Sequence, residues 1–483
     1  MYSISMHYTE LNCISQFSFQ RGASSPETLV KRAFELGYRA LAITDECSFA
    51  GSVRAHAAAK EVGLKLIHGS EFAVGHDKVI ALAKNHDGYS ALCALISDAR
   101  RSADKGDYKL ANGALYELPS EDLVVLWRPS RYVEIDIALG QRLSQHFSHF
   151  YVALALHYVA GEPYYQAMLE TAAQTQGWQV VASHEVVMAK SSDRPLQDVL
   201  TCLKHHVTIE QAGTRLYQNG QRHLLSLAQL AERYPAPYLA HTEHINALCS
   251  FSLDQLNYRY PHEVSGGIDP SKRLAQLSWE GAKQRWPKGI APAIKAQIEH
   301  ELKLIAELEY EHFFLTVHDI VRFARSRGIL CQGRGSAANS VVCFCLYITE
   351  VDPSRQTMLF ERFISKERRE PPDIDVDFEH DRREEVIQYI YQRYGRHRAA
   401  LAASVITYRP KSAIRDIGRV LGLEDEIVDA LARSHSWWDK GDAINERLQE
   451  LGLSLDSPRI ARLVWLLPQL LGAPRHLSQH VGG

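Results

Sequence analysis

The first 245 residues alternate short apolar runs with helical stretches, and this alternation constrains the fold more than any other feature of the chain. Helical spacing of apolar residues is seen over residues 27–36 and 53–62. Strands that alternate with helices favour a parallel sheet or a barrel, since each helix covers one face of the sheet. We therefore predict an α/β domain over residues 1–245, whose buried strands include residues 41–45, 64–68, 79–82, 123–126 and 180–182.

The rest of the chain divides into a middle and a C-terminal part. A chain of 483 residues is long enough for about three domains. Turn-forming residues are concentrated between Tyr260 and Pro270, which is typical of a domain boundary. Apolar residues then follow helical spacing, and the chain is mostly helical from residue 406 onward. We expect one domain over residues 246–405 and a helical domain over residues 406–483.

Residues 371–378 read PPDIDVDF, so that three carboxylates alternate with three apolar side chains. Because the side chains of a strand alternate between its two faces, Asp373, Asp375 and Asp377 share one face. A divalent cation would offset the repulsion among them, so we predict a strand that presents carboxylates to Mg²⁺. An EF-hand calcium loop is the nearest alternative, but it needs Gly where Phe378 stands. A solvated acidic edge strand is the plainer alternative.

Charge is distributed unevenly around this acidic strand, although the net charge of the whole chain is only −3. Residues 370–381 contain six acids and no bases. Residues 322–369 contain nine Lys or Arg against four acids, and residues 382–419 contain nine against three. An acidic island between basic flanks suits a metal site whose substrate is a polyanion.

Residues 333–340 read GRGSAANS, between a strand-like run and an apolar run. Gly335 allows close approach of the backbone to a ligand, Arg334 adds charge and Ser336 adds a hydroxyl. Exposed N–H groups at the start of a following helix would suit a phosphate. The pattern is neither a Walker A loop nor a GxGxxG fingerprint. A tight glycine turn followed by a helix cap is the alternative interpretation.

Two further sets of basic residues are candidates for phosphate contacts. Lys411, Arg415 and Arg419 are spaced by four, so they share one helix face that can follow a DNA backbone. A solvated basic face explains this spacing equally well. Arg362 precedes the acidic strand, and its guanidinium can meet a triphosphate. With carboxylate-bound metals, these parts predict a nucleotidyltransferase or a phosphodiesterase.

Several classes of protein are disfavoured. The chain has no apolar run of about 18 residues that would span a membrane, and its start lacks the features of a signal peptide. Its eight Cys form no CxxC pair, so neither a zinc ribbon nor a thioredoxin-type motif is indicated. We expect a cytoplasmic protein with reduced cysteines.

Four stretches together resemble the bacterial C-family DNA polymerases, the family of the polymerase III alpha subunits. The beginning of the chain, with FSF at 17–19 and TDEC at 44–47, is most similar to the error-prone, damage-inducible branch of that family. The resemblance covers essentially the whole chain. The four stretches are CQGRGSAANS (331–340), LFERFIS (359–365), EPPDIDVDF (370–378) and YRPKSAIRD (408–416).

The resemblance implies an N-terminal PHP domain, which is a distorted (β/α)₇ barrel, then a nucleotidyltransferase palm of the polymerase-beta type and a helical thumb. It assigns Asp373 and Asp375 as catalytic ligands of a two-metal Mg²⁺ site, with Asp377 inside the same motif. Gly335 and Ser336 match the loop that contacts the incoming triphosphate. The implied activity is error-prone DNA-directed DNA synthesis past lesions.

The resemblance also implies partners, and the chain departs from the family in two ways. Primer-template DNA, deoxynucleoside triphosphates, the sliding clamp and mutasome accessory proteins are the implied partners. The third catalytic aspartate of the family would lie beyond Gly483, so we expect a fragment that is inactive alone. A non-catalytic module that binds DNA or protein partners and a PHP-type metal phosphoesterase are the alternatives.

The second departure concerns the PHP metal site. Residues 10–15 read ELNCIS where metal-competent members carry alternating His, and residues 185–187 read EVV where Asp-Val-His is common. We therefore expect a PHP domain without metal or nuclease activity. Four possible ligands remain, namely Asp45, Glu46, Glu71 and His184.

Overall fold

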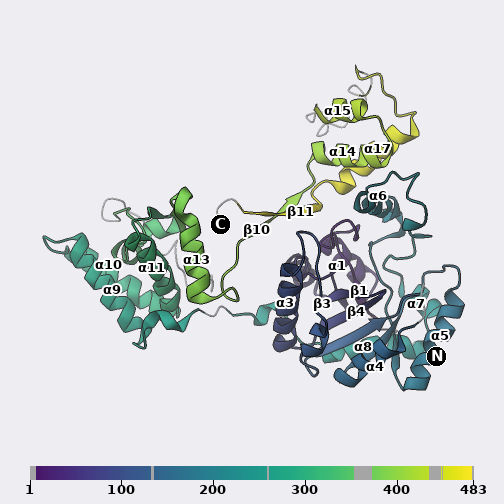
Figure 1. The fold of residues 1–483 in the computed structure, drawn as a ribbon, viewed down its shortest axis with the longest axis horizontal. Coiled ribbons are helices and arrows are strands. Elements are labelled where there is room, and N and C mark those ends of the chain that lie inside the picture. The colour runs from purple at the N-terminus through teal and green to yellow at the C-terminus, as the bar shows by residue number, and fades with distance from the viewer. Residues whose placement is uncertain are drawn as a thin grey trace. The chain divides into compact units, whose positions relative to one another are not determined.

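The computed structural model describes residues 7–131, 135–257, 260–352, 373–433, 448 and 450–480. The chain forms two compact units, whose elements are labelled in Figure 1. The first unit contains residues 1–256 together with residues 404–478, and the second contains residues 257–403 together with residues 479–483. Among the described residues, no helix is long and apolar enough to cross a membrane.

A seven-stranded sheet in chain order forms the centre of the first unit. The segment after the last strand returns to the first, because the Val186 N–H donates to the Asn12 carbonyl and the Ile14 N–H to the Val186 carbonyl. The sheet therefore curls on itself, which confirms the predicted α/β class. Its strands are β1 (Thr9–Cys13), β2 (Ala40–Ile43), β3 (Lys65–Val74), β4 (Asp77–Ala83), β5 (Leu123–Arg128), β6 (Phe150–Leu154) and β7 (Gln179–Ala182).

Strand β4 is the exception to parallel pairing, because it runs antiparallel to both β3 and β5. Only two residues join β3 to β4, and one of them, Gly75, has a φ of +60°. A link this short can join antiparallel strands only, whereas a parallel pair needs a long crossover. Helices follow every strand of this sheet except β3. They include α1 (Pro26–Glu35), α2 (Ser52–Val62), α3 (His86–Arg101), α4 (Ile137–His146), α5 (Glu162–Gln176) and α8 (Ala236–Leu248).

Both faces of this sheet are buried, which explains why its strands are visible in the sequence. Leu41 and Ile43 enter one apolar cluster, while Ala40 and Ala42 enter another on the opposite face. Strands buried on both faces have nearly continuous apolar sequences. Strand β1 was missing from the prediction because polar residues, Thr9, Glu10 and Asn12 among them, are buried within it.

The C-terminal part of the first unit is helical, as expected, but it also contains a two-stranded sheet of β10 (Ala403–Thr407) and β11 (Pro474–Gln479) that the prediction lacked. Apolar residues of its helices, such as Ile417 and Leu467, share a core with Leu200 of helix α6 (Arg194–His205). The helices are α14 (Pro410–Val420), α15 (Asp425–Arg433) and α17 (Pro458–Leu470).

The second unit packs helices against a small antiparallel pair of strands. Strand β8 (Cys331–Arg334) pairs with β9 (Asp375–Phe378), and between them in sequence lie a 3₁₀ turn (Gly335–Asn339) and the short helix α12 (Val341–Cys345). Leu274, Ile305, Phe314 and Val342 are among the residues of its core. The other helices are α9 (Pro270–Arg285), α10 (Pro292–Glu307), α11 (Glu311–Ser326) and α13 (Arg383–Tyr394).

Candidate active site

The acidic motif forms strand β9 and the extended residues that precede it. Asp373, Asp375 and Asp377 are exposed, whereas Ile374, Val376 and Phe378 are half-buried. The first two of these apolar side chains pack on the core of the second unit, and Phe378 packs on a smaller cluster beside α13. The alternation predicted from the sequence is therefore confirmed for the strand, while the metal-binding role of its carboxylates stays a prediction.

The glycine-rich turn lies directly beside the acidic strand. In the β8–β9 pair Arg334 stands opposite Asp375, and Gly335 follows with a φ of +63°. A Cβ atom at Gly335 would lie 3.8 Å from Oδ2 of Asp375. Gly333 also requires a missing side chain, because a Cβ atom there would lie 2.6 Å from the Ile348 carbonyl oxygen. Two motifs far apart in the sequence thus lie side by side in the structure.

Arg334 is paired with the third carboxylate of the strand. Its Nη2 donates to Oδ1 of Asp377 at 2.8 Å, and its Nε contacts the other carboxylate oxygen. The pairing engages both oxygens of Asp377. Because the side chains of Arg334 and Asp377 are 67% and 51% exposed, the pair contributes at most about 1 kcal/mol. A phosphate therefore competes readily for Arg334.

The carboxylates fit Mg²⁺ only in part. Within the part of the chain that the structure describes, no group of three or more His, Cys, Asp or Glu residues is arranged to hold a metal. Mg²⁺ is commonly bound by one or two carboxylates, with substrate phosphates and water completing its coordination. Asp373 and Asp375 fit an arrangement of that kind, in which the nucleotide itself supplies ligands.

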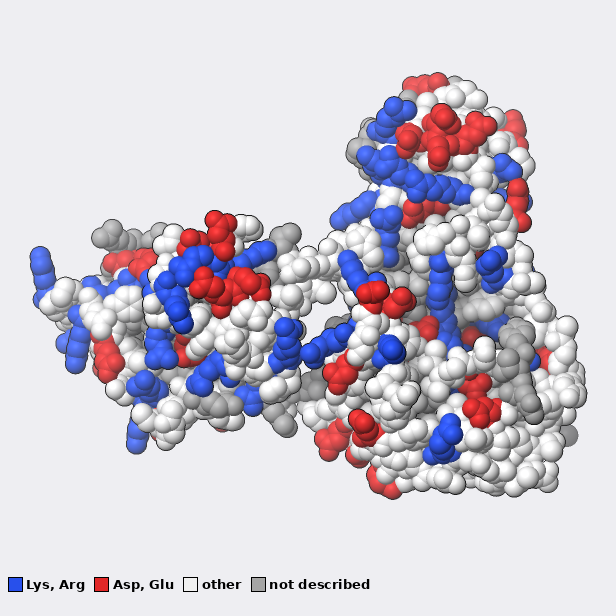
Figure 2. All heavy atoms as spheres, in the orientation of Figure 1, with Lys and Arg blue, Asp and Glu red and all other residues white. Residues whose placement is uncertain are grey.

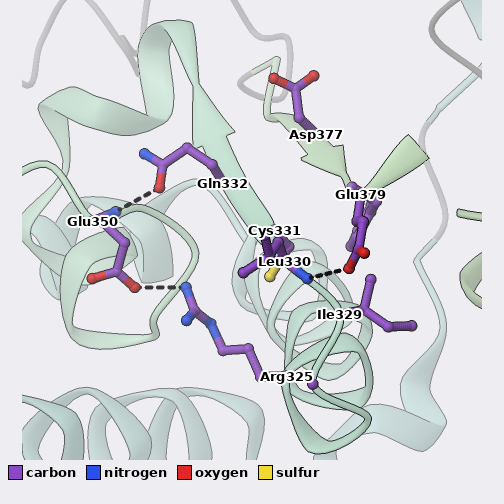
Figure 3. A pocket seen from close by; sticks show the side chains of 10 residues that line it. Arg325, Ile329, Leu330, Cys331, Gln332, Glu350, Asp377 and Glu379 are labelled. Carbon is purple, nitrogen blue, oxygen red and sulfur yellow. Dashed lines mark hydrogen bonds and ion pairs between the residues drawn. The ribbon is translucent and has the colours of Figure 1, made fainter. Parts of the chain in front are cut away.

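A cavity of about 590 Å³ lies along β8. Arg325 and Glu350 point toward one another in it, with 2.6 Å between Nη2 and Oε1 (Figure 3). Its lining carries the carboxylates of Glu350, Asp377 and Glu379 against the single guanidinium of Arg325. Arg285 also contacts Glu350, and Arg334 contacts Asp377, so both of these lining carboxylates are already paired with arginines.

The start of helix α12 contradicts the expectation that exposed N–H groups follow the glycine-rich turn. Its N–H groups at Val341 and Val342 donate to the buried carboxylate of Glu301, at 3.0 and 2.9 Å. They are therefore engaged within the protein, and the expectation that they face a phosphate is wrong. The sequence does contain a signal for Glu301, because it lies three residues after Ile298 and four before Ile305 on an otherwise apolar face of α10.

Asp319 is another residue that the sequence analysis missed, and it joins α11 to α13. It accepts hydrogen bonds from the Tyr389 hydroxyl at 2.6 Å, the Tyr394 hydroxyl at 2.8 Å and Arg322 at 2.9 Å. Burial alone would raise the pKa of Asp319, but these donors hold it below its usual value. The contact positions α13, which follows the acidic strand, against the helix that precedes β8.

The basic row on α14 belongs to the first unit. Lys411 and Arg419 are exposed, while Arg415 is half-buried and donates to Asp429 at 2.9 Å. Figure 2 shows acidic side chains interspersed with basic ones over the part that holds α14, α15 and α17. The DNA-backbone role of this row stays a prediction. Arg362 and the side chain of Ser336 lie outside the described residues.

The remaining candidate ligands of the barrel domain are engaged by protein groups. Asp45 accepts from the Ser15 N–H and hydroxyl and from the Ser18 hydroxyl. Both ring nitrogens of His184 have partners, the Tyr234 hydroxyl and the Gln221 carbonyl. Such neighbours leave these two residues poorly placed to coordinate an ion.

Cationic side chains surround the glutamates of the same region. Glu71 is fully buried and lies 2.7 Å from Arg21, 3.3 Å from Arg128 and 3.4 Å from Lys78. Burial raises the pKa of Glu71, but the cations outweigh it and lower the pKa to about 2. Glu46 likewise pairs with Arg21 and Lys78, both at 2.9 Å. Glu46 and Glu71 therefore do not fit a catalytic metal site, because cationic side chains already neutralise their carboxylates.

Comparison with known proteins finds two matching domains, one in each half of the chain. Residues 10–193 match the PHP domain, and residues 272–483 match the Bacterial DNA polymerase III alpha NTPase domain. The curled sheet thus lies in the part of the chain that matches the PHP domain, and the glycine turn and the acidic strand lie in the part that matches the polymerase III alpha domain.

Curated relatives of the chain share one name. Proteins named error-prone DNA polymerase from Alkalilimnicola ehrlichii and Methylococcus capsulatus are 54% and 50% identical over 479 residues, which is 99% of this chain and 46% of each relative. The one from Pseudomonas savastanoi is 50% identical over 483 residues, 99% of this chain and 47% of the relative. The chain thus spans about half the length of the relatives that it matches.

Proposed function

We propose that the chain is part of an error-prone DNA-directed DNA polymerase that acts in damage-induced translesion synthesis in the cytoplasm. The observation that carries this proposal is the contact between the glycine turn and the acidic strand, in which Gly335 faces a carboxylate oxygen of Asp375. Phosphoryl transfer requires mainly positioning and charge neutralisation. A backbone turn can position a triphosphate, and Mg²⁺ bound by the exposed carboxylates would supply the charge neutralisation.

The residues of this chain have distinct roles in the proposed reaction. Asp373 and Asp375 hold Mg²⁺, which when bound neutralises the triphosphate and activates the primer 3′-hydroxyl. The missing side chain of Gly335 allows phosphate oxygens to approach the carboxylate edge. Arg334 exchanges its partner Asp377 for a phosphate, and Ser336 and Arg362 add contacts to the same triphosphate.

The proposed partners are primer-template DNA and deoxynucleoside triphosphates. Lys411, Arg415 and Arg419 contact the DNA backbone in this proposal, and Arg415 must then leave Asp429. By family resemblance, the sliding clamp and mutasome accessory proteins bind the whole polymerase.

Primer extension by the full-length gene product that contains this chain tests the site. We expect Asp373→Ala and Asp375→Ala to lower the rate with Mg²⁺ at least about 100-fold, as losses of charge-stabilising groups do in other enzymes. Asp381→Asn, in the same acidic island but outside the strand, is the matched control and should retain the wild-type rate. Wild-type extension by both alanine variants would show that the site is assigned wrongly.

A DNA-binding module without catalysis is the second candidate, and the exposed side chains of Lys411 and Arg419 favour it. Fluorescence anisotropy of the 483-residue chain with primed DNA should show binding that weakens as salt increases. Binding that is absent or insensitive to salt would exclude this function. A PHP phosphoesterase has less support, because arginines neutralise the glutamates that a metal would need.

A further inference from the structure

A buried carboxylate lies beneath the segment that follows the glycine turn. Glu301 on α10 has no exposed surface, and neither has Ser340, at the end of the turn. Its Oε1 accepts from the Val341 N–H at 3.0 Å, and its Oε2 accepts from the Val342 N–H at 2.9 Å and the Ser340 hydroxyl at 2.8 Å. Three donors from one short segment therefore converge on this carboxylate.

Ser340 extends this contact into helix α12. While its hydroxyl donates to Glu301, the same oxygen accepts from the Cys343 N–H at 3.0 Å. Its carbonyl accepts from the Phe344 N–H at 3.1 Å. The first turn of α12 is thus held to α10 by consecutive hydrogen bonds that begin at Glu301.

Packing alone does not explain a carboxylate at this position. Glu301 lies in line with Ile298 and Ile305, both fully buried, so an apolar residue would continue the face. Burying an ionised group is costly unless hydrogen bonds compensate, and burial raises the pKa of Glu301 to about 7. A residue that breaks the local pattern in this way is expected at a functional site.

The turn between Gly335 and Asn339 is held at both ends. At its start, the backbone of Arg334 lies opposite that of Asp375 in the β8–β9 ladder. At its end, Ser340 is bonded to Glu301. Ala337, midway along the turn, is fully buried. The position of Gly335 beside the acidic strand therefore depends on two anchors, of which one is the strand itself and the other is Glu301.

We propose that Glu301 is a positioning residue for the nucleotide site, which holds the Gly335–Asn339 turn in the orientation that presents its backbone to a triphosphate beside Asp375. This inference rests on the proposed function for the identity of the ligand. Glu301 acts through the turn and does not touch the substrate.

Hydrogen–deuterium exchange of the 483-residue chain tests the effect of Glu301 on the turn. We expect Glu301→Ala to raise exchange at least about tenfold over residues 335–342, because three buried donors lose their acceptor. Glu301→Gln should have a smaller effect, since one amide oxygen can still accept. Glu299→Gln, an exposed change on the same helix, is the matched control.

The pattern of exchange separates positioning from general stabilisation. Exchange in α11 should change by less than about twofold in Glu301→Gln if the effect is confined to the turn. Unchanged exchange over residues 335–342 in both variants would overturn the proposal. An equal increase across α9, α10 and α11 would also overturn it, because Glu301 would then stabilise the unit as a whole.

Primer extension by the full-length gene product tests the consequence for nucleotide binding. We expect Glu301→Gln to raise the KM for deoxynucleoside triphosphate about tenfold, with a kcat within about threefold of the wild type, because ground-state binding is impaired more than chemistry. A fall in kcat with unchanged KM would contradict a positioning role at the triphosphate. If Asp375→Ala retains wild-type extension, the proposed function fails, whereas the exchange result still decides whether Glu301 holds the turn.

Discussion

Replacing Arg21 by Met should destabilise the first unit strongly. The Arg21 side chain is 12% exposed, and its Nη1 lies 2.7 Å from Glu71 and 2.9 Å from Glu46. Its Nη2 lies 3.7 Å from Glu185, which also pairs with Arg128. Met retains much of the volume of Arg but removes the charge, so buried carboxylates lose a shared partner.

The expected loss of unfolding free energy can be worked out from the ion pairs of Glu71. Its pKa is lowered from 4.5 to about 2, and each pKa unit corresponds to about 1.4 kcal/mol, so its cations outweigh the cost of its burial by roughly 3.5 kcal/mol. Breaking a buried ion pair by removing one partner costs about 3–5 kcal/mol. Arg128 and Lys78 remain beside Glu71, but Glu46 and Glu185 also lose a partner, so we expect Arg21→Met to lower the free energy of unfolding by about 3 kcal/mol.

The effect should also depend on pH. The folded-state pKa of Glu71 lies below its usual value, so its ion pairs stabilise the unit fully above about pH 4.5. That contribution is lost as the pH falls toward 2. The difference between wild type and Arg21→Met should therefore be largest near neutral pH and shrink in acid.

Thiol labelling in urea measures the stability of this unit separately from the other. Cys13 on β1 is fully buried, so its modification, followed by mass spectrometry of its peptide, reports unfolding of the sheet. Arg54→Met is the matched control, because Arg54 pairs with Glu27 at the surface and should contribute less than about 1 kcal/mol. A loss below about 1 kcal/mol in Arg21→Met would refute the reasoning from buried charge.

Two further predictions concern helix packing and metal dependence. A Cβ atom in Gly281→Ala would lie 1.9 Å from the Cys345 carbonyl oxygen, so this variant should lose about 3 kcal/mol and show faster exchange in α9 and α12. Gly220→Ala, whose nearest contact would be 3.4 Å, should be nearly neutral. EDTA should leave the thermal unfolding midpoint of the first unit unchanged, since protein groups engage Asp45, Glu71 and His184; a clear downward shift would contradict this.

The sequence by itself determined those features that a local repeat encodes. The period of two in residues 373–378 set a strand with one carboxylate face, because successive side chains of a strand point to opposite faces. Continuous apolar runs revealed strands β2, β3, β4, β5 and β7, because both faces of their sheet are buried. Local spacing also put Lys411, Arg415 and Arg419 on one face of α14, while Ile414 and Ile417 of that helix are buried in the core.

Only the tertiary structure decided which distant groups meet. The ion pair between Arg334 and Asp377 joins residues 43 positions apart, and the bond from Val341 to Glu301 joins residues 40 positions apart. Neither contact gives a periodic pattern in the sequence, because each depends on strand register or on how helices cross. The antiparallel β4 likewise follows from one short link, and the neutralisation of Glu71 follows from arginines on separate segments. Sequence therefore identifies the carboxylates of the site, whereas folding decides which cation, turn or buried acid each part of it contacts.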